Sequence, residues 1–411
     1  MEEWKEYKLK DLLLIPIRNG LTKPSAIRGK GVRMIGMKEI FSMDFIRSVE
    51  MERVPVTERE YESSAIQNND LLFARQSLSL EGAGKCAIVL CVDEPTVFES
   101  HLIRLRVDSS KSNPFFIYYY FKSDIGRNQI KSLVQQVAAA GIRGKELVEL
   151  GITIPSLDFQ NRIVGVLQSL DDKIEVNKRI NDNLEQQAQA LFKSWFVDFE
   201  PFKDGEFVES ELGMIPKGWR VGTLGDICSQ SSEKVGNRKD VKVMSPVTTG
   251  NLMLSEEYFT KQVFSESIAK YKVVRIGAFA FNPARVNIGS LGRNEFDIDG
   301  CVSPVYVVFE CKNGYEHFFD LFRATERFKT EVLSRAIGGV RQSLNYSDFA
   351  MIKTVLAPKE IVMKFNPLIE IIKGVQKHNN KENERLAELR DTLLPRLMSG
   401  ELKVNEIEKS I

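Results

Sequence analysis

The chain has 411 residues, 43% of them apolar and 27% charged, and at ~150 residues per domain this length allows two or three domains. That composition excludes a collagen-like, a disordered or a disulfide-stapled chain, and neither a bilayer-spanning apolar run nor a signal peptide is found, so we expect a cytoplasmic protein. The 57 basic and 56 acidic residues leave a net charge of +1, which argues against a uniform positive coat but permits local basic patches.

Cysteine and histidine offer little material for metal or nucleophilic chemistry. The cysteines are Cys86, Cys91, Cys228, Cys301 and Cys311. None falls in a CxxC pair near a histidine, and we interpret all five as buried thiols. The 3 histidines lie far apart along the chain, so we expect no metal site and no histidine-based triad.

An internal repeat divides the chain into two similar halves. The matching segments begin at Trp4 and Trp219, at Asp70 and Gly277, at Gly141 and Gly339, and at Ile154 and Ala357. Their offset drifts between 198 and 215 positions, as insertions in surface loops would produce. The chain therefore consists of two repeats, each a globular module followed by a helix.

Each half is predicted to be a mixed module of strands and helices followed by one long helix, which gives an α+β fold. In the first half, 85–92 and 101–107 are predicted strands, and Asn113 with Pro114 opens a helix through about Gln135. In the second, a strand from Cys301 precedes a helix over about 315–335. The predicted boundaries are 1–155 for the first module, 156–200 for the central helix, 201–218 for a linker, 219–357 for the second module and 358–411 for the C-terminal helix.

Both long helices carry a heptad seam. Seam residues alternate four and three apart from Ile163 to Trp195, and a shift of 202 positions reproduces the pattern from Phe365 to Leu397. A narrow apolar stripe needs a partner, so we predict that the helices pair antiparallel, with the numbers of facing residues summing to about 560. The predicted pairs are Ile163 with Leu397, Leu167 with Leu393, Ile174 with Leu386, Asn177 with Asn383, Asn181 with Asn379, Leu191 with Ile369, and Trp195 with Phe365.

The four asparagines at the centre of the seam are predicted to set its register. An amide facing an amide satisfies its hydrogen bonds, whereas an asparagine facing a leucine in a slipped register would cost roughly 1 to 3 kcal/mol. The alternative is that each helix packs only on its own half and leaves the asparagines exposed. A paired rod of about 35 residues per helix would be roughly 50 Å long. It would hold two similar modules apart, a geometry suited to duplex DNA, where sites on one face recur every ~34 Å.

Positive charge gathers in three windows that contain no acid, at 12–38, 125–145 and 267–294. The phosphate-facing candidates in them are Arg28, Lys30, Arg33, Arg143, Lys145 and Arg293. The base-reading candidates follow repeated segments, and Arg143 and Lys145 belong to both sets. They are Arg75, Gln76, Ser77, Arg143, Lys145, Asn282, Arg285, Asn287, Arg341, Gln342 and Ser343. The two halves carry different side chains, so two DNA-reading modules would read different sequences. The alternative for each residue is a solvated surface side chain with local hydrogen bonds.

The sequence assigns no catalytic residue. The segment 82–86 resembles a phosphate-binding loop, but Ser79 stands where that motif needs glycine and Cys86 where it needs a hydroxyl. The segment 282–284 resembles an amino-methyltransferase motif but lacks its second proline and its aromatic residue. No nucleophile, base and orienting residue can be assembled, and we interpret the chain as a binding scaffold and not an enzyme.

Three segments resemble the hallmark stretches of the specificity subunit of Type I restriction-modification enzymes. They are WFVDFEPF from Trp195, SELGMIPKGW ending at Trp219, and LLPRLMSGEL from Leu393, and the similarity spans the whole chain. The resemblance implies that each recognition domain binds one half of a split double-stranded DNA target, while the helices separate the domains and dock two modification subunits. It also implies that S-adenosylmethionine, ATP and Mg belong to the modification and restriction subunits, and that this chain binds no cofactor.

Two other functions stay open at this point. A tether that joins two protein-binding modules without touching DNA is supported by the near-zero net charge. A stand-alone methyltransferase would require this chain to bind S-adenosylmethionine by itself.

Overall fold

A computed structural model of the chain describes residues 4–136, 140–258, 265, 267–312, 314–335 and 343–402. The chain forms two compact units, residues 1–177 with 381–411 and residues 178–380. Each unit contains one mixed module and one end of each long helix, α6 (Leu157–Phe196) and α12 (Lys359–Met398). No helix within the described ranges has the length and apolar character that a membrane crossing requires.

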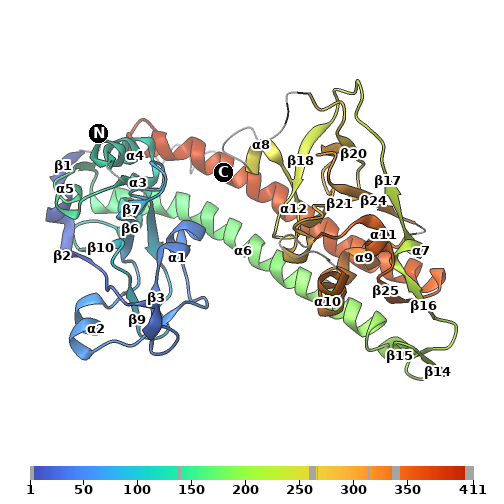
Figure 1. Cartoon of the computed structure of the whole chain (residues 1–411). Coiled ribbons are helices and arrows are strands. Elements are labelled where there is room, and N and C mark those ends of the chain that lie inside the picture. Colours follow the sequence, from blue (N-terminus) through green and yellow to red (C-terminus); the bar gives the residue numbers. More distant parts are fainter. Residues whose placement is uncertain are drawn as a thin grey trace. The chain divides into compact units, whose positions relative to one another are not determined.

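The first module is built around a five-stranded sheet in the order β2-β10-β6-β8-β4 (Figure 1, blue to teal). Its strands are β1 (Lys5–Lys8), β2 (Leu13–Asn19), β3 (Val32–Ile35), β4 (Phe45–Ile46), β5 (Arg53–Val54), β6 (Leu71–Ala74), β7 (Gln76–Ser77), β8 (Cys86–Val89), β9 (Thr96–Phe98), β10 (Leu102–Val107), β11 (Gln135–Gln136), β12 (Ala140–Gly141) and β13 (Gly151–Ile154). Its helices are η1 (Leu9–Leu12), η2 (Ser25–Ile27), α1 (Met37–Ser42), α2 (Glu58–Ser64), α3 (Pro114–Lys122), α4 (Asp124–Leu133) and α5 (Gly144–Leu147).

Both faces of this sheet are covered. Side chains alternate between the two faces of a strand, so Leu71 and Phe73 of β6 join the core that contains α3, while Leu72 and Ala74 join a second core on the opposite face. All four are fully buried, and the run of apolar residues without alternation follows from this double coverage.

The second module has two four-stranded sheets, β17-β24-β21-β22 and β19-β18-β23-β20. Strands of the second unit are β14 (Phe207–Ser210), β15 (Gly213–Pro216), β16 (Arg220–Thr223), β17 (Cys228–Ser231), β18 (Lys242–Pro246), β19 (Leu252–Leu254), β20 (Lys272–Val274), β21 (Phe279–Phe281), β22 (Leu291–Arg293), β23 (Gly300–Val302), β24 (Val307–Cys311) and β25 (Lys353–Leu356). Its helices besides α6 and α12 are η3 (Glu200–Phe202), α7 (Leu224–Ile227), α8 (Ser255–Tyr258), η4 (Val286–Ile288), α9 (Glu316–Phe322), α10 (Glu326–Arg335) and α11 (Tyr346–Ala350).

The internal repeat is present in the structure. Strand β1 pairs antiparallel with β13, with Lys5 opposite Ile154, and β16 pairs in the same way with β25, with Arg220 opposite Leu356. A short helix follows each first strand, η1 in one module and α7 in the other. The predicted strand at 101–107 is β10, and the predicted strand at 85–92 contains β8.

Three predicted elements are interrupted. The helix expected over 114–135 is two helices, because Ser123 ends α3 and its hydroxyl accepts a hydrogen bond from the Gly126 amide at 3.5 Å to begin α4. The helix expected over 315–335 is likewise α9 and α10, with the Thr325 hydroxyl accepting from the Phe328 amide at 3.3 Å. The strand expected from Cys301 is β23 and β24, separated around Pro304.

The predicted N-cap is confirmed, while the expectation for the cysteines holds only in part. The Asn113 side chain accepts a hydrogen bond from the Phe115 amide at 2.8 Å, with Pro114 at the first helical position. Cys86, Cys228 and Cys301 are buried, but Cys311 is half-buried and the expectation is wrong for Cys91, which is exposed.

The segment expected as a linker, 201–218, contains the hairpin of β14 and β15. The chain around it packs on Trp219, whose ring lies 5.4 Å from that of Phe199 and 5.1 Å from that of Phe202. Aromatic burial therefore holds a segment whose composition is typical of a loop.

Helices α6 and α12 pack together in the predicted antiparallel register. In the first unit, the Asn177 amide donates to the Asn383 side-chain oxygen at 3.0 Å. In the second, the Asn379 amide donates to the Asn181 side-chain oxygen at 2.8 Å. Both pairs sum to 560 as predicted, and they contradict the alternative in which each helix packs only on its own half.

The apolar seam agrees with this register. The Trp195 and Phe365 rings lie 5.5 Å apart. Leu191 and Ile369 belong to one core of the second unit, and the first unit's core contains Ile163 with Leu397 and Leu167 with Leu393. Each module thus packs on a helix pair formed by one end of α6 and one end of α12.

Candidate nucleic-acid interface

In the first module, two separately predicted sets of DNA-contact residues lie side by side. Strand β7, which contains Gln76 and Ser77, pairs antiparallel with β12, and the Ile142 amide donates to the Arg75 carbonyl at 2.9 Å. Arg143 and Lys145 directly follow β12 and are both exposed. The tertiary fold therefore joins the set at 75–77 to the set at 143–145, which are almost 70 positions apart in the sequence.

The loop between β7 and β8 (residues 78–85) is held in one shape by hydrogen bonds at its base. The Gly84 amide donates to the Ala74 carbonyl at 2.8 Å, and the Ser79 amide donates to the Ser77 hydroxyl at 3.1 Å. Gly84 has a φ of +72°, and a Cβ on it would lie 2.3 Å from the Ile130 side chain. Only glycine fits there, so this glycine closes the loop against α4.

The second module has the equivalent loop between β21 and β22 (residues 282–290). It is closed by the Asn282 amide, which donates to the Ser290 carbonyl at 3.0 Å, and its Asn282 side chain accepts from the Ala284 amide at 3.0 Å. Arg285 is exposed at the start of η4, and Asn287 is half-buried within it.

Ser343, from the last predicted set, is exposed and adjoins this loop, because the next residue, Leu344, donates its amide to the Pro283 carbonyl at 3.1 Å. Arg341 and Gln342 lie outside the described residues.

Segments 75–85 and 282–290 each accept a similar long-range backbone hydrogen bond. Ile142 donates to Arg75, and Leu344, 202 positions after Ile142, donates to Pro283. Both donors are buried. By this correspondence the counterpart of Arg143 is Asn345, which caps α11 by accepting from the Asp348 amide at 2.9 Å.

Asn345 was missed by the sequence reasoning, which aligned Gly141 with Gly339 on a shared three-residue pattern. The constant offset of 202 seen in the long helices was the signal that could have found it. Gly339 itself lies outside the described residues, so that part of the alignment stays a prediction.

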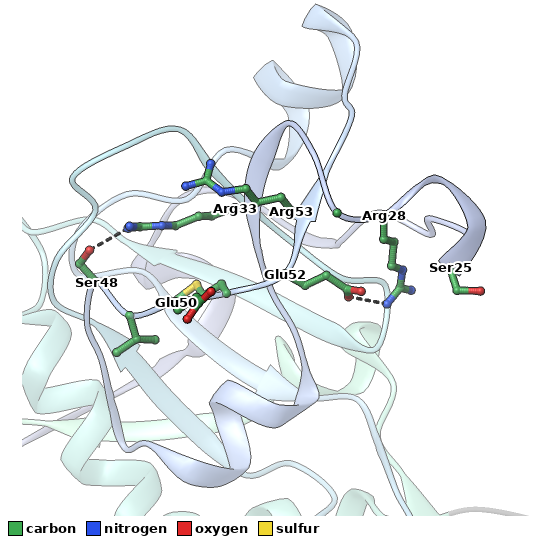
Figure 2. Close-up of a pocket in the computed structure, with 10 residues that line it drawn as sticks. Ser25, Arg28, Arg33, Ser48, Glu50, Glu52 and Arg53 are labelled. Carbon is green, nitrogen blue, oxygen red and sulfur yellow. Dashed lines mark hydrogen bonds and ion pairs between the residues drawn. The ribbon is translucent and has the colours of Figure 1, made fainter. Parts of the chain in front are cut away.

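Arg28 and Arg33 lie elsewhere in the first module, beside a pocket of about 680 Å³ (Figure 2). The Arg28 guanidinium donates to Glu52 at 2.7 Å, and that of Arg33 donates to Asp93 at 2.6 Å and to the Ser48 hydroxyl at 2.7 Å. The window 12–38 contains no acid in the sequence, but acids from other segments pair with Arg28 and Arg33 in the fold. Lys30 is exposed.

Arg293 turns toward the interior of the second module. Its guanidinium lies 5.8 Å from the centre of the Phe279 ring, its Nε donates to the Gly277 carbonyl at 3.3 Å, and His317 Nδ1 is 3.5 Å away. Burial, followed by the Arg293 cation, lowers the pKa of His317. Both observations indicate that Arg293 contributes to the module's own packing.

A cluster of cations at the base of the loop between β7 and β8 was not found from the sequence. Lys122 Nζ lies 2.8 Å from Asp44, and Lys85 Nζ lies 3.8 Å from the same side chain. Burial lowers the pKa of Lys85, and the cations of Lys122 and Arg127 lower it further. Three cations around one acid leave a local excess of positive charge. The sequence did not reveal this excess, because acids lie close to these cations along the chain.

Among the described residues, no group of three or more histidine, cysteine, aspartate or glutamate side chains could hold a metal ion. The polar side chains of the candidate surfaces are those of arginine, lysine, asparagine, glutamine and serine, which are the groups that contact phosphates and base edges.

The chain is similar to known DNA specificity subunits along nearly its whole length. The family model of the Type I restriction modification DNA specificity domain matches residues 1–186. The chain is 26% identical to the Type I restriction enzyme MjaIX specificity subunit of Methanocaldococcus jannaschii, over 99% of this chain and 95% of that protein. It is 24% identical to the HindI specificity subunit of Haemophilus influenzae, over 98% of this chain and 100% of that protein.

Among solved structures, the S subunit of a Type I restriction-modification system from M. genitalium has a similar fold. It superposes with a TM-score of 0.56 at 15% sequence identity, and the match covers 96% of each chain.

Proposed function

We propose that this chain, which is similar over nearly its whole length to Type I restriction enzyme specificity subunits, is a non-catalytic DNA specificity subunit and reads a bipartite and asymmetric DNA target, one half with each module. The observation that carries this proposal is the equivalence of the two loops. Segments 75–85 and 282–290 each follow a buried strand, β6 or β21, each is closed by hydrogen bonds, and each is joined to a second segment by the Ile142 or the Leu344 amide. The side chains on the two loops differ, so the two half-sites would differ as well.

The proposed base-reading residues lie on or beside these loops, except for Arg341 and Gln342, which lie outside the described residues and are proposed from the sequence. In the first module they are Arg75, Gln76, Ser77, Arg143 and Lys145, and in the second Arg285, Asn287, Arg341, Gln342 and Ser343, with Asn345 added by the structure. An arginine can donate two hydrogen bonds to guanine, and an asparagine or glutamine can pair in the same way with adenine.

Arg28, Lys30, Arg33 and Arg293 are proposed as phosphate contacts of a weaker kind. To bind a phosphate, Arg28 would have to give up its ion pair with Glu52, and Arg33 its ion pair with Asp93. The net gain in binding energy would therefore be small. The sequence-independent affinity should come mainly from exposed cations such as Lys145 and from the cluster around Lys85.

The proposed division of the chain follows the repeat, with recognition domains at 1–155 and 219–357 and helical segments at 156–200 and 358–411. We assign to the paired helices the separation of the two half-sites and the docking of two modification subunits, to which restriction subunits are added. Each helix has 40 residues and is thus about 60 Å long. S-adenosylmethionine, ATP and Mg are assigned to those partner subunits.

Selection of duplexes from a random library by the full chain together with its modification subunits tests this function. We expect a target with two separate half-sites and an affinity that falls as salt is raised. Arg285→Ala should relax preference in only one half, at a cost of about 1 to 3 kcal/mol. Lys217→Ala, which removes an exposed cation remote in sequence from the loops, is the matched control and should leave both halves unchanged.

Two outcomes would contradict the proposal. Indifference to DNA sequence would instead favour a tether between protein-binding modules. Heat released when S-adenosylmethionine is titrated into this chain alone would favour a stand-alone methyltransferase.

A further inference from the structure

The two closed loops expose large aliphatic side chains among their polar residues, and in the first loop Leu80, at 52%, is exposed as well as the more exposed Leu78. Leu78, which follows Ser77 in the first module, is 103% exposed, and Ile288, which follows Asn287 in the second, is 56% exposed. A single exposed aliphatic residue on a protein surface needs no explanation by itself. Here an exposed aliphatic side chain occurs on the loop of each module, although Leu78 lies near the start of its loop and Ile288 near the end of its own.

The Leu78 side chain is presented by a preorganised backbone. The Ser77 hydroxyl accepts from the Ser79 amide at 3.1 Å, and the Ser79 hydroxyl accepts from the Gly82 amide at 3.2 Å. A Cβ on Gly82 would lie 2.2 Å from the Ser77 hydroxyl, so the two strands of the loop meet there closely. The loop therefore cannot fold over and bury Leu78 without losing these contacts.

The Ile288 side chain is held in a comparable way. It ends η4, and the next residue, Gly289, has a φ of +95°, with a Cβ position 2.6 Å from the Thr248 carbonyl. Ser290 is buried and its hydroxyl donates to the Pro246 carbonyl at 2.6 Å. Gly289 and Ser290 hold the backbone next to Ile288 in place and so keep its side chain exposed. The hydroxyls of Ser77 and Ser79 do the same for Leu78.

The chemistry around these side chains identifies what they contact. Arg75 and Gln76 precede Leu78, and Arg285 and Asn287 precede Ile288, so each aliphatic residue closely follows side chains suited to phosphates and base edges. An aliphatic group gains nothing from a phosphate. The apolar surfaces that DNA offers are the thymine methyl group in the major groove and the face of a base at an opened step.

We propose that Leu78 and Ile288 are apolar base-contacting residues, one for each half of the target. This inference rests on the proposed function and adds to it a specificity element that polar side chains do not supply. Because the two residues occur on different modules, each should act on one half-site alone.

The test uses the full chain with its modification subunits and the duplex that the wild-type complex selects from a random library. Leu78→Ser should weaken binding to this duplex by about tenfold and relax selection in one half. Ile288→Ser should do the same in the other half. Leu78→Met, which keeps an apolar side chain, should recover most of the affinity and thereby show that the loop still folds.

Matched controls are exposed aliphatic residues away from the loops. Leu14 on β2 is 59% exposed and Val305 between β23 and β24 is 71% exposed. Leu14→Ser and Val305→Ser should bind and select as the wild type does.

Two further arms distinguish the source of the apolar contact. If Leu78 touches a thymine methyl group, uracil in place of thymine in that half should weaken the wild-type complex by the same factor and leave Leu78→Ser unaffected. If it enters an opened base step, 2-aminopurine in that half should brighten when the wild type binds but not when Leu78→Ser binds. Either result supports the proposal.

Unchanged affinity and selection in both Leu78→Ser and Ile288→Ser would overturn the inference and leave the proposed function standing. Equal losses in both halves from either variant would overturn it as well. A wild-type complex that selects no sequence would instead contradict the proposed function itself.

Discussion

Arg390 of α12 donates a hydrogen bond to Asp171 of α6 at 2.6 Å, and the second oxygen of Asp171 accepts from the Tyr119 hydroxyl at 2.7 Å. Asp171 and Tyr119 are buried. The carboxylate thus joins the first module and both long helices within one unit. Burial by itself would lower the pKa of Arg390. The carboxylates of Asp171 and Asp391 outweigh this effect and raise that pKa.

Removing only Arg390 should lower the free energy of unfolding more than removing both Arg390 and Asp171. Arg390→Leu leaves the Asp171 charge buried with only the tyrosine as donor, and we expect a loss of about 3 to 5 kcal/mol in the free energy of unfolding. The double variant Asp171→Leu with Arg390→Leu should recover a large part of this loss. Urea unfolding followed by circular dichroism measures both, and strictly additive losses would contradict the prediction.

Replacing one asparagine of a central pair should lower the stability of the protein. Asn177 is 1% exposed, and its amide donates to Asn383 at 3.0 Å and to Glu382 at 2.7 Å. Asn177→Leu leaves the Asn383 side chain facing an apolar group, and we expect a loss of about 1 to 3 kcal/mol in unfolding free energy. Gln186→Leu, at an exposed position of the same helix, is the control and should change stability by less than about 0.5 kcal/mol.

Asp320 should make the stability of the second unit depend on acid pH. Burial by itself would raise the pKa of Asp320, but the Arg323, Lys373 and Arg293 cations outweigh it and lower the pKa to about 2. An unfolded aspartate titrates near ~3.9, so the charged form adds about 2 to 3 kcal/mol that is fully present above that pH and is lost as pH falls toward about 2.

The variant Asp320→Asn isolates this effect. It should be less stable than the wild type by about 2 to 3 kcal/mol at pH 7, and the difference should shrink by pH 3. Parallel urea titrations at the two pH values measure it. A stability difference that is the same at both would show that Asp320 acts through packing and not through its charge.

Cysteine labelling should show one fast thiol. Cys91 is exposed, whereas burial raises the pKa of Cys86 and raises that of Cys301 to about 11. Cys311 is half-buried, and its hydrogen bond with Cys228, with the sulfurs 3.6 Å apart, raises its pKa as does burial. Because the thiolate is the reactive form, a disulfide reagent at pH 8 should modify one thiol quickly, and Cys91→Ser should remove that phase. A second fast thiol in the variant would contradict the assignment.

Local and periodic features were accessible from the sequence. The heptad seam and its asparagines predicted the facing pairs Asn177 with Asn383 and Asn181 with Asn379, because seam spacing and amide pairing together admit one register. The N-cap at Asn113 was readable for the same reason, since a cap depends on the residue and its immediate neighbours.

Features that depend on segments far apart in the sequence were decided by the tertiary structure. Arg28 and Arg33 stand in a window without acids, yet Glu52 and Asp93 reach them once the chain folds. Residues 75–77 lie close to Arg143 only because β7 pairs with β12. The repeat, the helix register and the two-module plan follow from patterns written along the chain, whereas which charges remain available to a ligand follows from long-range packing, because charge neutralisation depends on distance in space and not on distance in sequence.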